Sequence, residues 1–321
     1  MGKAFITDYI DNPNIEKDII GDIAQDPNDP EIEVLLVWHK DVNREYLAQF
    51  KNLKGMIRYG VGTDNLDFEE ADRRNLYICN TPDYGIDEVS DTTIAMIMNF
   101  TRGIQEHDIA SKKIIDNSWQ ENINPKKRRS SELVVGVIGA GRIGSSVLIK
   151  SKSIGFSTVF YDPYKEQGHD KVVSAYRCDT IDEFLQLTDI VSINAKLNNE
   201  TNSLVNKDFI SKMKENAYLI NTARGRIVED LDNFIDPIKS EKISGVALDV
   251  LPDEPPSKNS LLIKSWRNND SWILGKVIIN PHTGYYSQES YIEMRQKASI
   301  NAKRILLNQK PYSILLDIKK N

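Results

Sequence analysis

The chain has 321 residues, enough for two domains with their own cores, and its composition is that of an ordinary globular protein, with 40% hydrophobic and 27% charged residues. A net charge of −6 argues against a nucleic-acid-binding surface, and no apolar run is long enough to span a membrane. There is no signal-peptide core, and the two cysteines suggest neither a metal site nor a disulfide, so we expect a cytoplasmic protein. The four histidines include no pair at metal-ligand spacing, so we expect no metal site.

Strand-like apolar runs alternate with helical stretches in the first hundred residues, which predicts a parallel α/β sheet. One long helix should run from residue 87 to about 110, interrupted at Gly103, which we interpret as a joint between domains. The polar, basic segment 122–131 is predicted to be a loop. The predicted strands are residues 4–7, 34–38, 56–59 and 77–80.

The most informative stretch is residues 133–162. A valine-rich predicted strand, 133–138, leads directly into the turn Gly139-Ala140-Gly141-Arg142-Ile143-Gly144. A helical pattern follows and should end at Gly155, and a second predicted strand, 157–161, finishes on Asp162. A strand, a glycine turn, a helix, a strand and an acid in this order are typical of a dinucleotide-binding fold.

Each part of this pattern has a role in binding a dinucleotide. Gly139 allows the tight turn, Gly141 lets the backbone approach a pyrophosphate, and Gly144 lets the helix pack close to the strand. The helix N-terminus supplies free N–H groups for the phosphates. Asp162 would accept both ribose hydroxyls of NAD and repel the 2′-phosphate of NADP. The plainer alternative is a glycine-rich turn in some other α/β protein, but the agreement of all parts favours NAD.

Further strands are predicted at residues 190–193, 217–220, 245–248 and 277–279, and an amphipathic helix at about 288–307. The layout is therefore nested. We expect a cofactor domain at residues 103–284, inserted in a smaller domain built from residues 1–102 and 285–321.

Three polar side chains follow three of these predicted strands: Arg224, Glu254 and His282. Alone, each has a plainer explanation: a surface arginine, a solvated acidic loop and a structural histidine. Together, at the carboxyl ends of strands beside an NAD site, they are what hydride transfer to a 2-oxo acid requires. The arginine would hold the carboxylate through two N–H bonds, the histidine would protonate the carbonyl oxygen, and the acid would keep the imidazole charged.

The segments TARG, DVLPDEP and NPHTG, together with GAGRIG, resemble the D-isomer-specific 2-hydroxyacid dehydrogenases from about residue 34 to 307. The resemblance implies an α/β protein in which a Rossmann doubly wound parallel sheet domain is inserted in a smaller flavodoxin-like substrate domain. It also implies NAD as the cofactor, a small 2-oxo or 2-hydroxy acid as the substrate, and a homodimer.

The resemblance also assigns roles to individual residues. The catalytic positions are Arg224, Glu254 and His282. The substrate positions are Arg58, Val61 and Gly62, in a loop whose N–H groups bind the substrate carboxylate, and Tyr285. Asp249 matches the acid that contacts the nicotinamide amide. The other cofactor positions are Gly139, Gly141, Arg142, Ile143, Gly144, Asp162, Ala195, Thr201, Thr222 and Ala223.

Within the family, the segments NTPDYGIDEVSD and HTGYYSQESYIEMR are most similar to the branch related to the C-terminal-binding protein co-repressors. The chain departs from the family at Asn194 and Lys196, where His and Pro are frequent, and from the co-repressors at Tyr285, where they have tryptophan. Segment 257–276 is longer than in the co-repressors, and it could cover a cleft or a dimer edge or be a surface excursion. The alternative to an enzyme is an NAD(H)-responsive binding protein of the co-repressor type.

Overall fold

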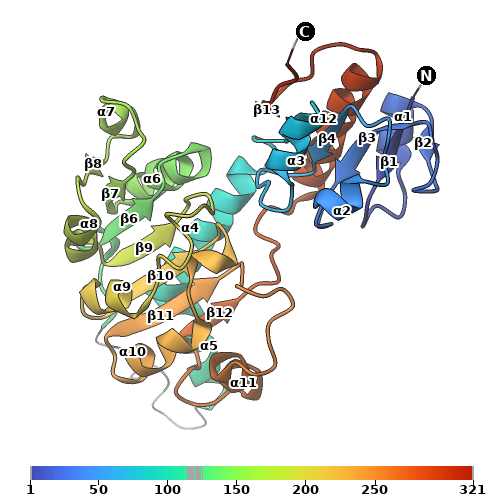
Figure 1. Cartoon of the computed structure of the whole chain (residues 1–321). Coiled ribbons are helices and arrows are strands. Elements are labelled where there is room, and N and C mark those ends of the chain that lie inside the picture. Colours follow the sequence, from blue (N-terminus) through green and yellow to red (C-terminus); the bar gives the residue numbers. More distant parts are fainter. Residues whose placement is uncertain (1, 114–118, 120–123, 125, 320–321) are drawn as a thin grey trace. The chain divides into compact units, whose positions relative to one another are not determined.

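The computed structural model describes residues 2–113, 119, 124 and 126–319. The chain divides into two compact units, Met1–Gly85 with Tyr286–Asn321, and Ile86–Tyr285. The first unit is thus made from both ends of the chain (Figure 1). The sequence-based boundary after residue 102 differs from this division by one helix, α4 (Ile86–Arg102), which packs in the core of the second unit. The loop predicted at 122–131 lies in part outside the described residues.

The first unit contains a sheet in the order β13-β5-β4-β3-β1-β2. Its parallel strands have the 2-1-3-4-5 order of flavodoxin-like folds, and β13 joins the edge antiparallel to β5. The strands predicted from apolar runs agree with β1, β3, β4 and β5 to within two residues. The strands are β1 (Lys3–Ile6), β2 (Ile23–Ala24), β3 (Ile32–Val37), β4 (Gly55–Arg58), β5 (Tyr77–Cys79) and β13 (Ile314–Leu316).

Helices cover this first sheet. The longest, α12, begins at a capping box in which Ser287 and Ser290 exchange side-chain and backbone hydrogen bonds, and it buries a stripe that includes Met294, Ala298 and Ala302. The helices of this unit are α1 (Asn14–Ile20), α2 (Arg44–Leu47), α3 (Phe68–Arg73) and α12 (Gln288–Leu306).

The second unit contains a fully parallel sheet in the order β12-β11-β10-β9-β6-β7-β8. This is the 3-2-1-4-5-6 order of the Rossmann fold with one more strand at the end, and the order reverses between β6 and β9. The predicted fold class is therefore confirmed. The strands are β6 (Val134–Ile138), β7 (Ser157–Tyr161), β8 (Tyr176–Arg177), β9 (Ile190–Ile193), β10 (Ala217–Asn221), β11 (Ile243–Leu248) and β12 (Val277–Ile279).

Both faces of this second sheet are buried, because successive side chains of a strand point to opposite faces. Leu219 packs with the core formed by α8 to α11, whereas its neighbour Ile220 packs with α4. Gly103 (φ 63°) separates α4 from α5, at the predicted interruption. The remaining helices are α5 (Ile104–Ser111), α6 (Arg142–Ile154), α7 (His169–Val173), α8 (Ile181–Leu187), α9 (Lys207–Lys212), α10 (Ile235–Lys239), α11 (Leu261–Asn268), and the 3₁₀ turns η1 (Ser130–Glu132), η2 (Gly225–Ile227) and η3 (Leu231–Phe234).

Candidate active site

The glycine turn connects β6 to α6 at the point where the strand order reverses. Gly139 has a φ of 90°, and a Cβ there would lie 2.7 Å from the backbone of Ala195. A Cβ at Gly144 would lie 2.0 Å from the carbonyl oxygen of Gly139, so the helix can approach the strand only with glycine at this position. Gly141 differs from both, because a Cβ there meets no atom within 4 Å. The turn is therefore tightly packed at Gly139 and Gly144 and open at Gly141. This is what a turn that binds a pyrophosphate requires.

Asp162 lies directly beside this turn. Its Oδ2 accepts the N–H of Ala140 at 2.9 Å, and its Oδ1 accepts the N–H of Tyr164 at 3.0 Å. The carboxylate is thus held in place from both sides, and each oxygen keeps a lone pair for a further donor. This geometry suits a residue that accepts the two hydroxyls of a ribose.

The loop after β9 forms the other side of the reversal point. Ala195 packs against Gly139, whereas the hydroxyl of Thr201 donates to the carbonyl of Lys196 at 2.6 Å and thereby closes its own loop. The buried Nδ2 of Asn194 has no hydrogen-bond partner among the residues that the structure describes. A buried donor without a partner is costly, so an amide at this strand end fits a bound polar ligand. In the sequence Asn194 stands out only as a departure from the family, although its place right after a buried strand is a usable signal for a site residue.

The loop after β10 carries Arg224. Asn221 holds this loop, because its Oδ1 accepts the N–H of Ala223 at 3.0 Å and its Nδ2 donates to the carbonyl of Arg224 at 2.9 Å. Thr222 is fixed by a 2.9 Å hydroxyl–hydroxyl bond to Thr93 on α4. Asn221 is not among the residues predicted for the site, since an asparagine at a strand end is common in turns.

Gly225 explains how the arginine loop approaches the acidic loop. A Cβ at Gly225 would lie 1.8 Å from the carbonyl oxygen of Leu251, so the two loops are in backbone contact and only glycine fits. The carboxylate of Glu254 follows within the same acidic loop, and its Oε1 accepts the N–H of Leu251 at 2.9 Å.

Glu254 and His282 form the centre of the site. Oε2 of Glu254 lies 2.7 Å from Nδ1 of His282, with 38% and 29% of the two side chains exposed. Burial raises the pKa of Glu254, but the bond to His282, the N–H of Leu251 and the charge of Arg224 outweigh it and hold this pKa below its ordinary value. Because Nδ1 faces the carboxylate, Nε2 is left as the nitrogen that can exchange a proton with a ligand. Arg224, Glu254 and His282 are thus brought together, as predicted from their strand ends.

Asp249 contacts the backbone of His282 and is almost fully buried, with 3% of its surface exposed. Its carbonyl oxygen accepts the N–H of His282 at 2.8 Å, and its Oδ1 accepts the N–H groups of Thr283 and Gly284 at 3.1 and 2.9 Å. Burial raises the pKa of Asp249, and these N–H groups and the nearby His282 offset the rise only in part. Asp249 therefore holds the histidine loop, while its contact with the nicotinamide amide stays a prediction.

The predicted substrate residues are distributed over both units. Arg58 is the last residue of β4 in the first unit, and Val61 and Gly62 lie in the loop that follows, where Asn80 Nδ2 donates to the carbonyl of Val61 at 2.7 Å. The side chain of Val61 is 40% exposed. Tyr285 is the last residue of the second unit, the unit that also holds the catalytic residues.

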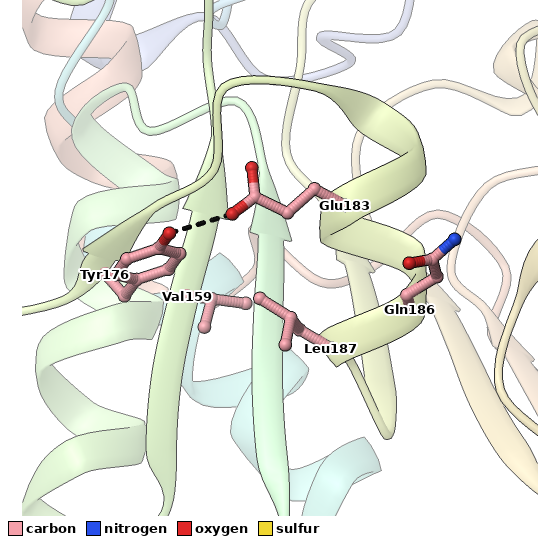
Figure 2. Close-up of a pocket in the computed structure, with 5 residues that line it drawn as sticks. All are labelled: Val159, Tyr176, Glu183, Gln186 and Leu187. Atoms are coloured by element: carbon pink, nitrogen blue, oxygen red, sulfur yellow. Dashed lines mark hydrogen bonds between the residues drawn. The ribbon is translucent and has the colours of Figure 1, made fainter.

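A hollow elsewhere in the second unit is lined by α8 and by the outer strands β7 and β8 (Figure 2). Its hydrophobic wall includes Val159 and Leu187, and the hydroxyl of Tyr176 donates to Glu183 at 2.8 Å. Val159 lies in the middle of β7, so the hollow is away from the carboxyl ends of the strands, and no residue predicted for the site lines it.

Two further features bear on the class of protein. In the described part of the chain, no helix has the length and apolar character needed to cross a membrane. Within the same residues, no cluster of three or more histidine, cysteine, aspartate or glutamate side chains could hold a metal ion.

Comparison with known proteins finds relatives in one family. Residues 94–284 match the family described as D-isomer specific 2-hydroxyacid dehydrogenase, NAD binding domain. The chain is 32% identical to glyoxylate reductase of Thermofilum pendens over 85% of this chain and 78% of that protein. It is 28% identical to C-terminal-binding protein 1 of Caenorhabditis elegans over 89% of this chain, but spans only 39% of that protein. The crystal structure of D-lactate dehydrogenase from Aquifex aeolicus, complexed with NAD and lactic acid, has a TM-score of 0.83 at 25% identity, covering 99% of this chain and 100% of that chain.

Fold and site together define an α/β dinucleotide-binding protein with an arginine, a carboxylate and a histidine at neighbouring strand ends. The chain belongs to the D-isomer-specific 2-hydroxyacid dehydrogenase family, and its second unit contains the family's NAD-binding domain.

Proposed function

We propose that the protein is an NAD-dependent dehydrogenase that reduces a small 2-oxo acid to a D-2-hydroxy acid, or carries out the reverse reaction. The observation that carries the proposal is the 2.7 Å pair of Glu254 and His282, with Arg224 in the neighbouring loop of the same sheet. The class of substrate is supported by the names of the relatives, which include a glyoxylate reductase and a D-lactate dehydrogenase.

Each side chain of this centre has a defined task. Arg224 binds the substrate carboxylate through two parallel N–H bonds, which orients the carbonyl carbon. His282 donates the proton on Nε2 to the carbonyl oxygen, and in the reverse direction it takes the proton from the hydroxyl. Glu254 stabilises the charged imidazole and fixes its orientation through Nδ1. Bound NADH supplies the hydride.

The remaining residues bind the cofactor and the substrate. The N–H groups at the start of α6, next to Gly141, bind the pyrophosphate, while Asp162 accepts the ribose hydroxyls and so favours NAD over NADP. The other roles follow the family resemblance. Arg142, Ile143, Ala195, Thr201, Thr222, Ala223 and Asp249 are proposed cofactor contacts, and Arg58, Val61, Gly62 and Tyr285 are proposed substrate contacts. We further propose a cytoplasmic homodimer, which light scattering of the purified protein would test.

The test is consumption of NADH, followed by its absorbance, with a panel of 2-oxo acids that includes glyoxylate, pyruvate and hydroxypyruvate. We expect turnover with at least one of them, and its near-complete loss in His282→Gln. NADH binding without turnover on any acid would favour the other candidate, an NAD(H)-responsive binding protein, which the likeness to C-terminal-binding protein 1 supports.

A further inference from the structure

A hydrogen bond joins two loops that follow different strands of the second sheet. The hydroxyl of Tyr164, three residues after the end of β7, donates to the carboxylate of Glu200, seven residues after the end of β9. In this sheet β6 lies between β7 and β9 (Figure 1). The bond therefore joins loops whose strands are two strand spacings, about 10 Å, apart, with the carboxyl end of β6 and its glycine turn between them.

Both side chains are placed by short, well-bonded turns. Asp162 accepts the N–H of Tyr164 at 3.0 Å, and Asn198 Oδ1 accepts the N–H groups of Glu200 and Thr201, each at 3.0 Å. Tyr164 is nevertheless 72% exposed. The pair is thus positioned by the turns that carry it and is not part of the core.

The carboxylates of Glu200 and Asp162 both affect the Tyr164 hydroxyl. The hydrogen bond to Glu200 is the main cause that raises the pKa of Tyr164, followed by burial, and the charge of Asp162 adds to it. Arg177 is held at this loop by backbone acceptors, because it donates to the carbonyl oxygens of Asp162 and Lys165 at 3.3 and 3.0 Å.

We propose that Glu200, held across the glycine turn by Tyr164, is a second residue that selects the cofactor: with Asp162 it repels the 2′-phosphate of NADP. The inference rests on the proposed NAD site, in which Asp162 accepts the ribose hydroxyls. A 2′-phosphate is a dianion and would lie within a Debye length, about 10 Å, of both carboxylates, whereas the 2′-hydroxyl of NAD carries no charge.

The chain offers a matched control. The hydroxyl of Tyr176 donates to Glu183 at 2.8 Å, the same chemistry in the same unit, but beside the hollow at the sheet edge (Figure 2). The experiment measures the dissociation constants of NADH and NADPH by nucleotide fluorescence for the wild type, Glu200→Gln and Glu183→Gln. The ratio of the two constants isolates the 2′-phosphate, because the pyrophosphate is common to both.

We expect Glu200→Gln to improve NADPH binding relative to NADH roughly fivefold at low salt, and less at high salt, whereas Glu183→Gln leaves the ratio unchanged. Tyr164→Phe keeps the charge of Glu200 but removes the hydrogen bond that holds it. This variant should shift the ratio in the same direction by a smaller factor. An unchanged ratio in Glu200→Gln, while Asp162→Asn alters it, would overturn this inference alone. Failure of the wild type to bind NADH would instead overturn the NAD site itself.

Discussion

Replacing Gly141 by alanine separates cofactor binding from folding more cleanly than any other change in the glycine turn. The backbone there has φ −71° and ψ −159°, at the margin of the extended region and with a negative φ that alanine adopts, and the new methyl group would meet no atom within 4 Å. The free energy of unfolding should therefore stay the same or rise by about 0.4–1 kcal/mol, because alanine restricts the unfolded chain. The methyl group would, however, occupy the space through which the pyrophosphate approaches the start of α6.

The cost to cofactor binding follows from the bonds that the phosphate would lose. A hydrogen bond to a charged group contributes about 1.5–3 kcal/mol, so loss of one weakens NADH binding about ten- to hundredfold. Fluorescence titration with NADH measures this loss, and thermal unfolding of the same sample checks stability. Gly225→Ala is the contrasting variant: its methyl group would lie 1.8 Å from the Leu251 carbonyl oxygen, so it should reduce turnover about a hundredfold through the displaced Arg224. A stable Gly141→Ala protein with unchanged NADH affinity would refute the assignment of the turn.

Three further predictions concern the charged residues. Asp162 should make kcat/KM much higher with NADH than with NADPH, and equal values would contradict its role. Arg224→Lys should lower turnover severely despite the retained charge, since one ammonium group cannot form two parallel bonds, while NADH affinity should change little; a fully active variant would contradict this. Glu254 has a lowered pKa, so its carboxylate is ionised throughout the neutral range and loses its charge only in acid. Glu254→Gln should therefore remove a stabilising charge from the imidazolium, moving the fall of the reduction profile, and the rise of the oxidation profile, to lower pH. If neither profile moves, another carboxylate must act on His282.

The strands of the second sheet could be predicted because parallel strands buried on both faces are nearly continuous apolar runs, as in Val134–Ile138 and Ile243–Leu248. Two-residue strands such as β2 and β8 contain too little pattern to detect. For segment 257–276 the sequence allows a cover or a surface excursion. Part of the segment belongs to the core, because its helix α11 buries Leu262 and Ile263 there and Trp266 packs against them.

The catalytic residues could be predicted because strand order places their loops at one edge of the sheet. The contacts between these loops could not be predicted, because they depend on loop conformations that the sequence pattern does not specify. Nothing in the sequence around Gly225 indicates its backbone contact with Leu251. The hydrogen bonds of Asn221 to its own loop, and the bond between Tyr164 and Glu200, likewise depend on loop paths that a single sequence does not specify.

The central claim is that this site transfers hydride to and from the D-isomer of a 2-hydroxy acid through His282. It is tested most directly by incubating the wild type and His282→Gln with NAD and each isomer of lactate, glycerate and other 2-hydroxy acids, and following the formation of NADH. We expect NADH formation with the D-isomer of at least one acid, none with its L-isomer, and loss of the reaction in His282→Gln although this variant still binds NADH. Equal reaction of both isomers, or full activity without the histidine, would contradict it.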